Sequence, residues 1–315
     1  MPDRIVLASR GSKLALAQAR TVADLITRAH PAIQVEIKTV RTRGDRDRRP
    51  FHEIGGKGIF MGEVEREVVE GAADLAVHSA KDLTDALHPD CTLAAVPVRV
   101  DARDVVVGGR GETGEDRLGS LPEGASVGTS SLRRRSLLLE ARPDLRVVEL
   151  RGNLDTRLRK VADGEVDAAI LAAAGIARLG LTEEVRPATL DPSWWVPAPA
   201  QGALAIEARR DRADVADLVG SFDDPAARAE VECERAFGRR IEGGCSIPVG
   251  CRAEAGDGRL LVTGFLGRTD GTYSIRDRIS GPLGAAAEMG RDLAEAILAG
   301  GGEEILEDVR AGDAP

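Results

Sequence analysis

The sequence has few aromatic residues and no excess of basic charge. Phe, Trp and Tyr together make up 3% of the 315 residues, so stacking surfaces for nucleic-acid bases are scarce and the core must be aliphatic. The formal net charge is −9, whereas binding to nucleic acid or to an anionic membrane usually requires a basic face. The sequence therefore predicts a protein with no nucleic-acid and no membrane partner.

Cysteine and histidine are also scarce and lack the spacing of a metal site. The four cysteines include no Cys-x-x-Cys pair, and none of the four histidines has ligand spacing to them. Neither a disulfide framework nor a bound metal is predicted. Three of the cysteines are interpreted as small buried hydrophobic residues, namely Cys91, Cys233 and Cys251.

Long hydrophobic runs are absent too. No stretch approaches about 18 uninterrupted apolar residues, and the first residues show no signal-peptide pattern. We therefore expect a cytoplasmic protein. With 315 residues and 43% hydrophobic content, the chain is long enough for two or three domains.

Strand and helix patterns alternate along the first third of the chain. Residues 4–8, 33–40 and 74–77 have the apolar character of strands, and residues 12–28 and 60–70 have that of helices. Strands that alternate with helices predict a sheet with parallel strands.

The same pattern starts again after residue 101. Strands are expected at 104–107, 125–128, 146–149 and 167–171, with helices over 132–141 and 154–161. A further strand at 202–207 would return to the first unit. From residue 221 the pattern changes to a helix at 225–239, three strands near Ile247, Leu260 and Tyr273, and a closing helix through 286–298.

These patterns predict an α/β fold of three domains. Two similar domains with mixed or parallel sheets, of periplasmic-binding-protein-like type, would flank a cleft, followed by a smaller α+β domain. The expected ranges are 1–101 with 199–220, 102–198, and 221–315. Ligands in such folds bind at the carboxyl ends of strands and the amino ends of helices.

Positive charge is concentrated at three predicted strand-to-helix turns. Arg133, Arg134 and Arg135 follow the sequence Gly-Thr-Ser-Ser at 128–131, so free N–H groups and hydroxyls would meet arginines at a helix N-terminus. Such an end binds carboxylate or phosphate. Arg151 in the turn at 147–153, and Arg10 with Ser12 in the turn at 9–12, repeat the arrangement. One such turn could be explained by helix capping alone, but three favour an anionic ligand.

The segment 77–82 ends a predicted strand and contains His78, Ser79, Lys81 and Asp82. In an extended segment Ser79 and Lys81 would lie on one side and Asp82 on the other. A solvated Lys81–Asp82 ion pair beside a half-buried His78 is an equally good interpretation. Alternatively, a carboxylate near cations stays ionised and can stabilise a positive charge.

Two glycine-rich segments do not have the features of nucleotide-binding sites, whereas a third segment contains a pair of glycines followed by a cysteine. Residues 109–114 fit G-x-G-x-x-G but are followed by a segment too short for the required helix, and 55–58 lack the rest of a Walker A loop. Cys245 follows two glycines, which would let its sulfur approach a bulky group. Cys245 is therefore a candidate covalent attachment point.

Seven of these motifs, in order along nearly the whole chain, resemble the porphobilinogen deaminase family, also called the hydroxymethylbilane synthases. The motifs are Ser9-Arg10-Gly11-Ser12, Gly55-Gly56-Lys57-Gly58, Val77-His78-Ser79-Ala80-Lys81-Asp82, Gly128-Thr129-Ser130-Ser131-Leu132-Arg133-Arg134, Leu150-Arg151-Gly152-Asn153 with Thr156-Arg157-Leu158, Gln201-Gly202-Ala203, and Glu242-Gly243-Gly244-Cys245.

The resemblance implies a cytoplasmic transferase of haem and porphyrin biosynthesis, acting as a monomer. It would join four porphobilinogen molecules head to tail into hydroxymethylbilane with loss of ammonia, on a dipyrromethane cofactor held through a thioether to Cys245. Asp82 would be the catalytic carboxylate, and Gln201 with Gly202 would line the cleft. Side chains that would hold the acetate and propionate groups are Arg10, Ser12, Lys57, Ser79, Lys81, Thr129, Ser130, Arg133, Arg134, Arg151, Arg157 and Arg178.

Two other classes of function fit parts of the sequence. A binding protein for an anionic metabolite would use the same cleft but would not need Asp82 or Cys245, and its secreted forms carry a signal peptide. A phosphoryl-transfer enzyme would need a carboxylate pair for Mg²⁺ and a phosphate loop, which the sequence does not show. One departure from the family is Ala200, where members generally have glycine, so the conformation before Gln201 is left open.

Overall fold

A computed structural model describes residues 2–42, 61–84, 86–241 and 247–310. The chain divides into two compact units, one made of Met1–Val100 with Gly202–Arg228 and the other of Asp101–Gln201 with Ala229–Pro315. The three domains expected from the sequence are a finer division and stay a prediction. None of the helices in the described ranges is both long and apolar enough to cross a membrane.

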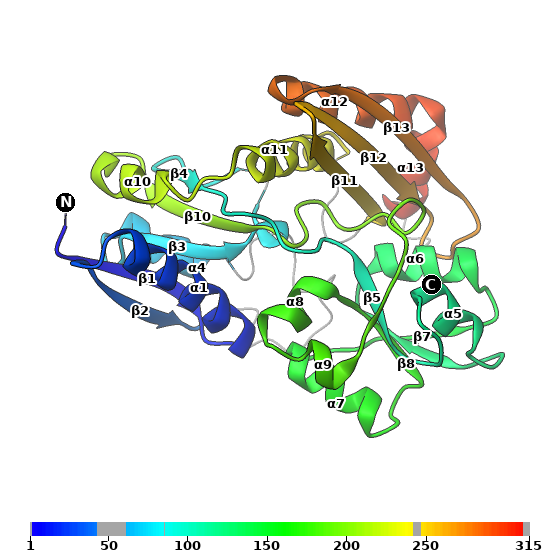
Figure 1. The fold of residues 1–315 in the computed structure, drawn as a ribbon. Helices are drawn as coiled ribbons and strands as arrows, with labels where there is room; N and C mark the ends of the chain where they lie inside the picture. The colour runs from blue at the N-terminus through cyan, green and yellow to red at the C-terminus, as the bar shows by residue number, and fades with distance from the viewer. Residues whose placement is uncertain (1, 43–60, 85, 242–246, 311–315) are drawn as a thin grey trace. The chain divides into compact units, whose positions relative to one another are not determined.

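The first unit is built on a five-stranded sheet of order β2-β1-β3-β10-β4 (Figure 1). Its strands are β1 (Arg4–Arg10), β2 (Gln34–Val40), β3 (Leu75–Ser79), β4 (Cys91–Ala95) and β10 (Leu204–Arg209). The first three are parallel, as the alternation of strands and helices predicts, but β10 is antiparallel to both of its neighbours. The sheet is therefore mixed.

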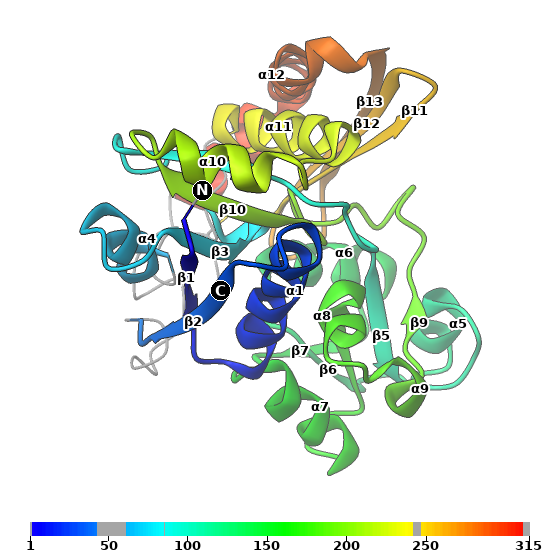
Figure 2. The same cartoon turned by 60° about the vertical axis from the view of Figure 1, so that its left-hand side comes forward.

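Helices cover both faces of this sheet. Helices α1 (Lys13–Ala29) and α10 (Ala213–Gly220) pack on one face through residues such as Val22 and Leu218, and α4 (Gly62–Val69) packs on the other through Val64 and Val68. Figure 2 shows α10 running along β10. Side chains of a strand alternate between faces, so both sides of the sheet are apolar and buried.

The second unit repeats this plan. Its five-stranded sheet has the order β7-β6-β8-β5-β9, in which β5 is antiparallel to its neighbours and β6 is parallel to β7 and β8. The strands are β5 (Asp104–Gly108), β6 (Ser126–Gly128), β7 (Arg146–Val148), β8 (Ala168–Ala172) and β9 (Ala188–Thr189). Both sheets thus have a parallel three-stranded part extended by an antiparallel strand.

The helices of this sheet again lie on two faces. One side is covered by α5 (Gly114–Gly119) and α6 (Leu132–Ala141), through Leu118, Leu137 and Leu138. The other side is covered by α7 (Leu154–Ala162), α8 (Ala173–Arg178) and α9 (Thr182–Val185). Because α6 follows β6 directly, its first turn lies at the carboxyl end of that strand, where ligands bind in such sheets.

The rest of the second unit is a three-stranded antiparallel sheet with helices on one face. Its elements are α11 (Pro225–Arg240), β11 (Val249–Gly256), β12 (Arg259–Gly267), β13 (Ser274–Pro282), α12 (Ala286–Ile297) and α13 (Glu303–Arg310). Phe237 of α11 and Leu293 of α12 are fully buried against the sheet. This is the α+β arrangement expected for the C-terminal part.

Candidate active site

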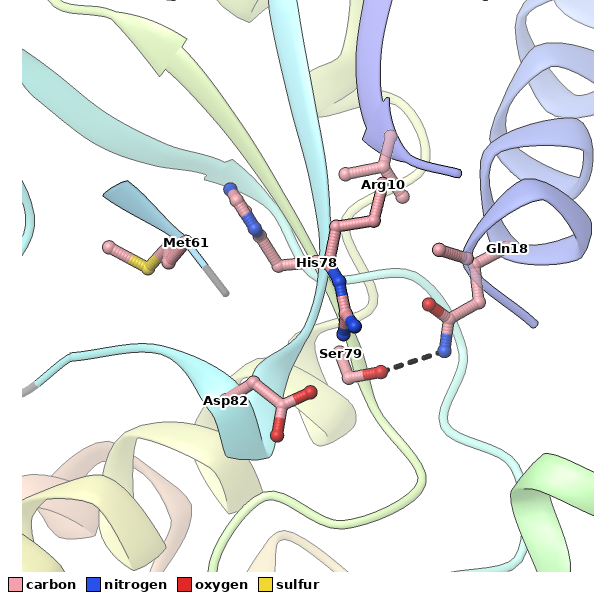
Figure 3. Close-up of a pocket in the computed structure, with 8 residues that line it drawn as sticks. Arg10, Gln18, Met61, His78, Ser79 and Asp82 are labelled. Carbon is pink, nitrogen blue, oxygen red and sulfur yellow. Dashed lines mark hydrogen bonds between the residues drawn. The ribbon is translucent and has the colours of Figure 1, made fainter. Parts of the chain in front are cut away.

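A small pocket in the first unit opens where β3 ends and the 3-10 helix η1 (Ala80–Asp82) begins (Figure 3). The pocket is lined by Arg10, Ala15, Gln18, Met61, Val77, His78, Ser79 and Asp82. In Figure 3 the carboxylate of Asp82, the hydroxyl of Ser79 and the guanidinium of Arg10 point toward the same space. The pocket therefore places a carboxylate, a hydroxyl and a cation together.

The expectation that the extended segment continues through residues 80–82 is wrong. Strand β3 ends at Ser79, and Ala80, Lys81 and Asp82 form one turn of 3-10 helix. In such a helix residues i and i+3 lie on the same side, because there are three residues per turn. Asp82 consequently lies on the same side as Ser79, and this single turn of 3-10 helix places both side chains in one pocket.

The remaining polar residues near this pocket have structural partners. His78 is 7% exposed and its Nε2 lies 3.1 Å from Oε2 of Glu207, so it has a partner and is more buried than the half-buried residue that the sequence suggested. Nε2 of Gln18 donates to Oγ of Ser79 at 2.8 Å. Ser12 caps α1, since its Oγ accepts from the N–H of Ala15 at 3.2 Å. Ligand binding by Ser12 and Ser79 stays a prediction.

In the second unit, helix α6 begins after Ser131, so the predicted turn at 128–131 does precede a helix N-terminus. Each of its three hydroxyls has a hydrogen bond within the unit. Oγ1 of Thr129 accepts from the N–H of Ser131 at 3.2 Å, Oγ of Ser130 donates to the carbonyl of Leu150 at 2.7 Å, and Ser131 caps the helix at the N–H of Arg134. These bonds fix the turn beside the end of β6.

Arg133 and Arg134 point into the unit and share one buried carboxylate. Nη2 of Arg133 donates to Oδ2 of Asp104, and Nη2 of Arg134 donates to Oδ1, both at 2.7 Å. The same carboxylate accepts from Nε1 of Trp195 at 2.9 Å and from Nε2 of Gln201 at 2.8 Å. Four donors saturate Asp104, which is fully buried.

The charges around Asp104 fix its ionisation. Burial alone would raise its pKa, but the charges of Arg133 and Arg134, with hydrogen bonds from Arg134 and Gln201, hold the pKa well below its usual value. Both arginines are also nearly buried, at 3% and 6% exposure. Ligand binding by Arg133 and Arg134 stays a prediction, whereas their engagement with Asp104 is observed. Arg135, the third arginine of the run, is half-buried.

A second group of arginines lies at the next turn of the same unit. Nε of Arg151 is 3.1 Å from Oε1 of Glu149, and Nε of Arg157 donates to the carbonyl of Gly152 at 2.8 Å. Burial, followed by the charges of Arg134 and Arg151, lowers the pKa of Arg157 to about 10, against a smaller opposing effect of Glu149. Burial disfavours the charged form of a guanidinium, and nearby positive charges lower its pKa further.

Arg178, at the end of α8, also lies in a buried setting, and burial lowers its pKa to about 10.

The turn at residues 147–153 requires a glycine. Gly152 has a φ of 108°, and a Cβ there would lie 2.8 Å from Cγ2 of Thr156. This second predicted strand-to-helix turn therefore exists, and it presents partly desolvated guanidiniums.

Some predicted residues lie elsewhere. Lys57 and Cys245 lie outside the described residues, and Lys81 is exposed on η1. Gln201 is buried and also donates to the carbonyl of Ala102 at 2.8 Å. Ala200 before it has a left-handed φ of 60°, a conformation that glycine adopts more readily. The glycine that the family resemblance implies at this position would adopt this conformation without strain.

Sequence reasoning missed Asp104, although a signal was present. Asp104 begins a strand whose next three residues are valines, and an acidic residue at the start of a fully buried strand needs a cationic partner. Glu207 is the parallel case in β10, where a carboxylate interrupts an apolar strand. Neither residue belongs to a short motif, because their partners are distant in sequence.

The chain has an α/β fold of two mixed five-stranded sheets with a smaller α+β part, as expected, and the second unit holds the buried pair Arg133 and Arg134. Two family models match it. Residues 5–217 match the "Porphobilinogen deaminase, dipyromethane cofactor binding domain" and residues 228–299 match the "Porphobilinogen deaminase, C-terminal domain". The chain belongs to the porphobilinogen deaminase family, and it is a transferase of tetrapyrrole biosynthesis that uses a dipyrromethane cofactor.

Curated relatives agree over almost the full length. The porphobilinogen deaminase of Roseiflexus castenholzii is 47% identical over 97% of this chain and 99% of its own, and that of Desulforudis audaxviator is 44% identical over 99% and 100%. Among solved structures, the methionine-binding protein MetQ has a TM-score of 0.42 at 13% identity, covering 70% of this chain and 90% of its own. A periplasmic substrate-binding protein of Coxiella burnetii has a TM-score of 0.44 at 16% identity, covering 71% and 94%.

Proposed function

We propose that this chain performs the reaction of its family with Asp82 as the catalytic carboxylate and with arginines holding the ligand. The reaction condenses four porphobilinogen molecules head to tail into hydroxymethylbilane and releases ammonia. The observation that carries the proposal is the local excess of positive charge at Arg157, whose pKa is lowered by burial and by the charges of Arg134 and Arg151 more than Glu149 raises it. A polyanionic ligand would supply the missing negative charge.

The ligand chemistry fits this excess. Each pyrrole ring brings an acetate and a propionate, so negative charge accumulates with every ring added. Guanidinium groups bind carboxylates through paired hydrogen bonds and stay charged when partly buried. The proposed ligand-holding residues are Arg10, Ser12, Lys57, Ser79 and Lys81 from the first half of the chain, and Thr129, Ser130, Arg133, Arg134, Arg151, Arg157 and Arg178 from the second, with Gln201 and Gly202 beside them.

Asp82 has the chemistry that the reacting atoms require. Loss of the protonated amine as ammonia leaves positive charge on the pyrrole of the substrate. An ionised carboxylate near the ring N–H stabilises that charge. When the new carbon–carbon bond forms, the ring carbon that attacks the methylene group of the deaminated pyrrole loses a proton, and a carboxylate in hydrogen-bonding reach can accept it. Arg10 and Ser79, which face the same pocket, would orient the substrate carboxylates.

Cys245 is proposed to attach the dipyrromethane cofactor through a thioether. When bound, this group supplies the carbon at which chain growth begins. A thioether needs no neighbouring base once formed, which suits a cysteine that follows two glycines. We also propose that the protein works in the cytoplasm as a monomer without nucleic-acid or membrane partners, in keeping with its net charge of −9.

The intact mass of the purified protein tests the attachment. We expect an excess over the sequence mass equal to two linked pyrrole units, localised by peptide mapping to the segment that contains Cys245. Cys245→Ser should lack the excess, and Cys233→Ser, which alters a buried cysteine of the same unit, should retain it. An active protein of unmodified mass would rule out covalent attachment.

Arg157→Leu tests the arginine cluster. We expect turnover to fall by on the order of 10- to 100-fold, because a charge-assisted grip on a ligand carboxylate is lost. The free energy of unfolding of ligand-free protein should change little, since burial and the charges of Arg134 and Arg151 already disfavour this guanidinium. The matched control is Arg159→Leu, an exposed position on the same helix, which should alter neither quantity. Equal turnover in both variants would remove Arg157 from the ligand site.

A further inference from the structure

A second cluster of reactive side chains lies in the first unit between α4 and the sheet. Glu65 of α4, Cys91 of β4 and Glu207 of β10 each offer a ligand atom, and these atoms all lie within 4.8 Å of one another. Cys91 and Glu207 are fully buried, and Glu65 is partly buried. The sequence separates them widely, so no short metal-binding motif reveals the cluster.

The sheet topology brings these residues together. Strand β10 lies between β3 and β4, and Glu207 is opposite Leu93, two residues from Cys91 on the same face. Helix α4 covers that face, and Cys91 packs there with Val64 and Val68. The surroundings are therefore apolar, which makes unneutralised carboxylates costly.

The carboxylates of this cluster lack full compensation. Among the described residues, neither Glu65 nor Glu207 forms an ion pair with an arginine or a lysine. Oε2 of Glu207 is held by His78 at 3.1 Å, but its buried Oε1 has no hydrogen-bond partner in the described part of the chain. An unsatisfied carboxylate oxygen is aimed into a cluster that already contains a thiol and a second carboxyl group.

The protonation of the cluster without a cation follows from its burial. Burial, and then the neighbouring Glu207, raises the pKa of the Cys91 thiol to about 12. Burial likewise raises the pKa of Glu65, and Glu207 adds to this against an opposing hydrogen bond from the backbone N–H of His88. A cation that binds the Cys91 sulfur must displace the thiol proton, so binding should strengthen as the pH rises.

We propose that Glu65, Cys91 and Glu207 bind one divalent transition-metal ion of the Zn²⁺ type, with His78 orienting Glu207 through its other oxygen. A thiolate ligand favours Zn²⁺ or Co²⁺ over Mg²⁺ or Ca²⁺, which prefer oxygen ligands only. Tetrahedral zinc holds such ligands about 3.5 Å apart, so the cluster would contract by about 1 Å. Binding releases the proton of the Cys91 thiol, and solvent would complete the coordination.

The test is a titration of the full-length protein, dialysed against a chelator, with Co²⁺ and then Zn²⁺. We expect one equivalent of Co²⁺ to give a thiolate charge-transfer absorption that Zn²⁺ abolishes, and we expect Zn²⁺ to raise the melting temperature. In Cys91→Ser the absorption should vanish and the Zn²⁺ affinity should fall by on the order of 100-fold, and His78→Gln should weaken binding about 10- to 100-fold.

The control is Cys233→Ser, which alters a fully buried cysteine in the other unit and should leave the absorption and the affinity unchanged. Circular dichroism of each variant shows whether it is folded. Cys91→Ser replaces only one sulfur atom by oxygen, so this variant can still test metal binding if the substitution of a glutamate prevents folding. Wild-type protein that binds neither ion stoichiometrically would overturn the proposal. A charge-transfer absorption that persists in Cys91→Ser would overturn it as well.

Discussion

Asp82→Asn is expected to lower the turnover number by about 10²- to 10⁴-fold, the range typical of a lost acid–base or charge-stabilising group. The amide keeps the shape of the side chain but can neither neutralise a pyrrole cation nor accept a proton. Asp82 is exposed on a single turn of 3-10 helix, so its replacement should leave the fold unchanged. Product formation from porphobilinogen, measured on protein whose mass shows both cofactor rings, checks this expectation.

The mass criterion separates catalysis from cofactor assembly, because a variant without the cofactor would be inactive for another reason. Asp24→Asn is a suitable control, since it removes an exposed carboxylate from α1 in the same unit and should preserve turnover. If Asp82→Asn carries the cofactor and retains a tenth or more of the wild-type turnover, Asp82 is not the catalytic carboxylate.

Asp104→Ala is expected to lower the free energy of unfolding by about 3–5 kcal/mol, the cost of removing one partner from a buried ion pair. The substitution would leave Arg133 and Arg134 buried side by side without a counter-charge and would deprive Trp195 and Gln201 of their acceptor. Urea denaturation monitored by tryptophan fluorescence should show a lower midpoint urea concentration. Trp195 reports on this site because its Nε1 donates to Asp104.

Two further variants show whether the loss of stability is caused by removal of the negative charge of Asp104. Asp104→Asn keeps the volume but not the charge, so it should also be strongly destabilised. Glu165→Gln removes one partner of an exposed pair with Lys160, whose atoms lie 3.6 Å apart, and should change stability by no more than about 0.5 kcal/mol. A similar small change for Asp104→Ala would mean that the two guanidiniums find other partners.

The stabilisation by Asp104 should also depend on pH. Its pKa in the folded protein is held below the unfolded value of about 3.9, so the unfolded chain binds the proton more readily. The contribution is therefore complete above about pH 4 and is lost as the pH falls further toward the folded pKa. Wild-type protein and Asp104→Asn should accordingly converge in stability at acidic pH.

The parallel parts of both sheets could be predicted because strand patterns alternate with helix patterns along the chain. Strands β1 and β2 and helix α1 appear in the sequence within a few residues of their observed bounds. By contrast, β4 and α10 are short and carry no distinctive pattern, and the antiparallel direction of β10 depends on the path of the whole chain. Local periodicity cannot encode that path.

The candidate site shows the same division between local and distant information. The turns at Ser12 and Ser131 are local, and both helices begin where capping residues predict. The carboxylate that Arg133 and Arg134 share is distant in sequence, so the run of arginines gave no sign that its first two members also pair with Asp104. The local excess of positive charge lies at Arg157, where the motif alone gave no reason to prefer it.

Strand β10 has a consequence for how the protein is made. It lies between β3 and β4, yet a ribosome synthesises it more than a hundred residues after both of them. Until β10 emerges, the nascent first unit has an unpaired edge at β3 and a detached β4, both of which can pair with other chains. The emerging chain must therefore wait for residues 204–209 before its first sheet can close, and this interval is when a chaperone would be most useful.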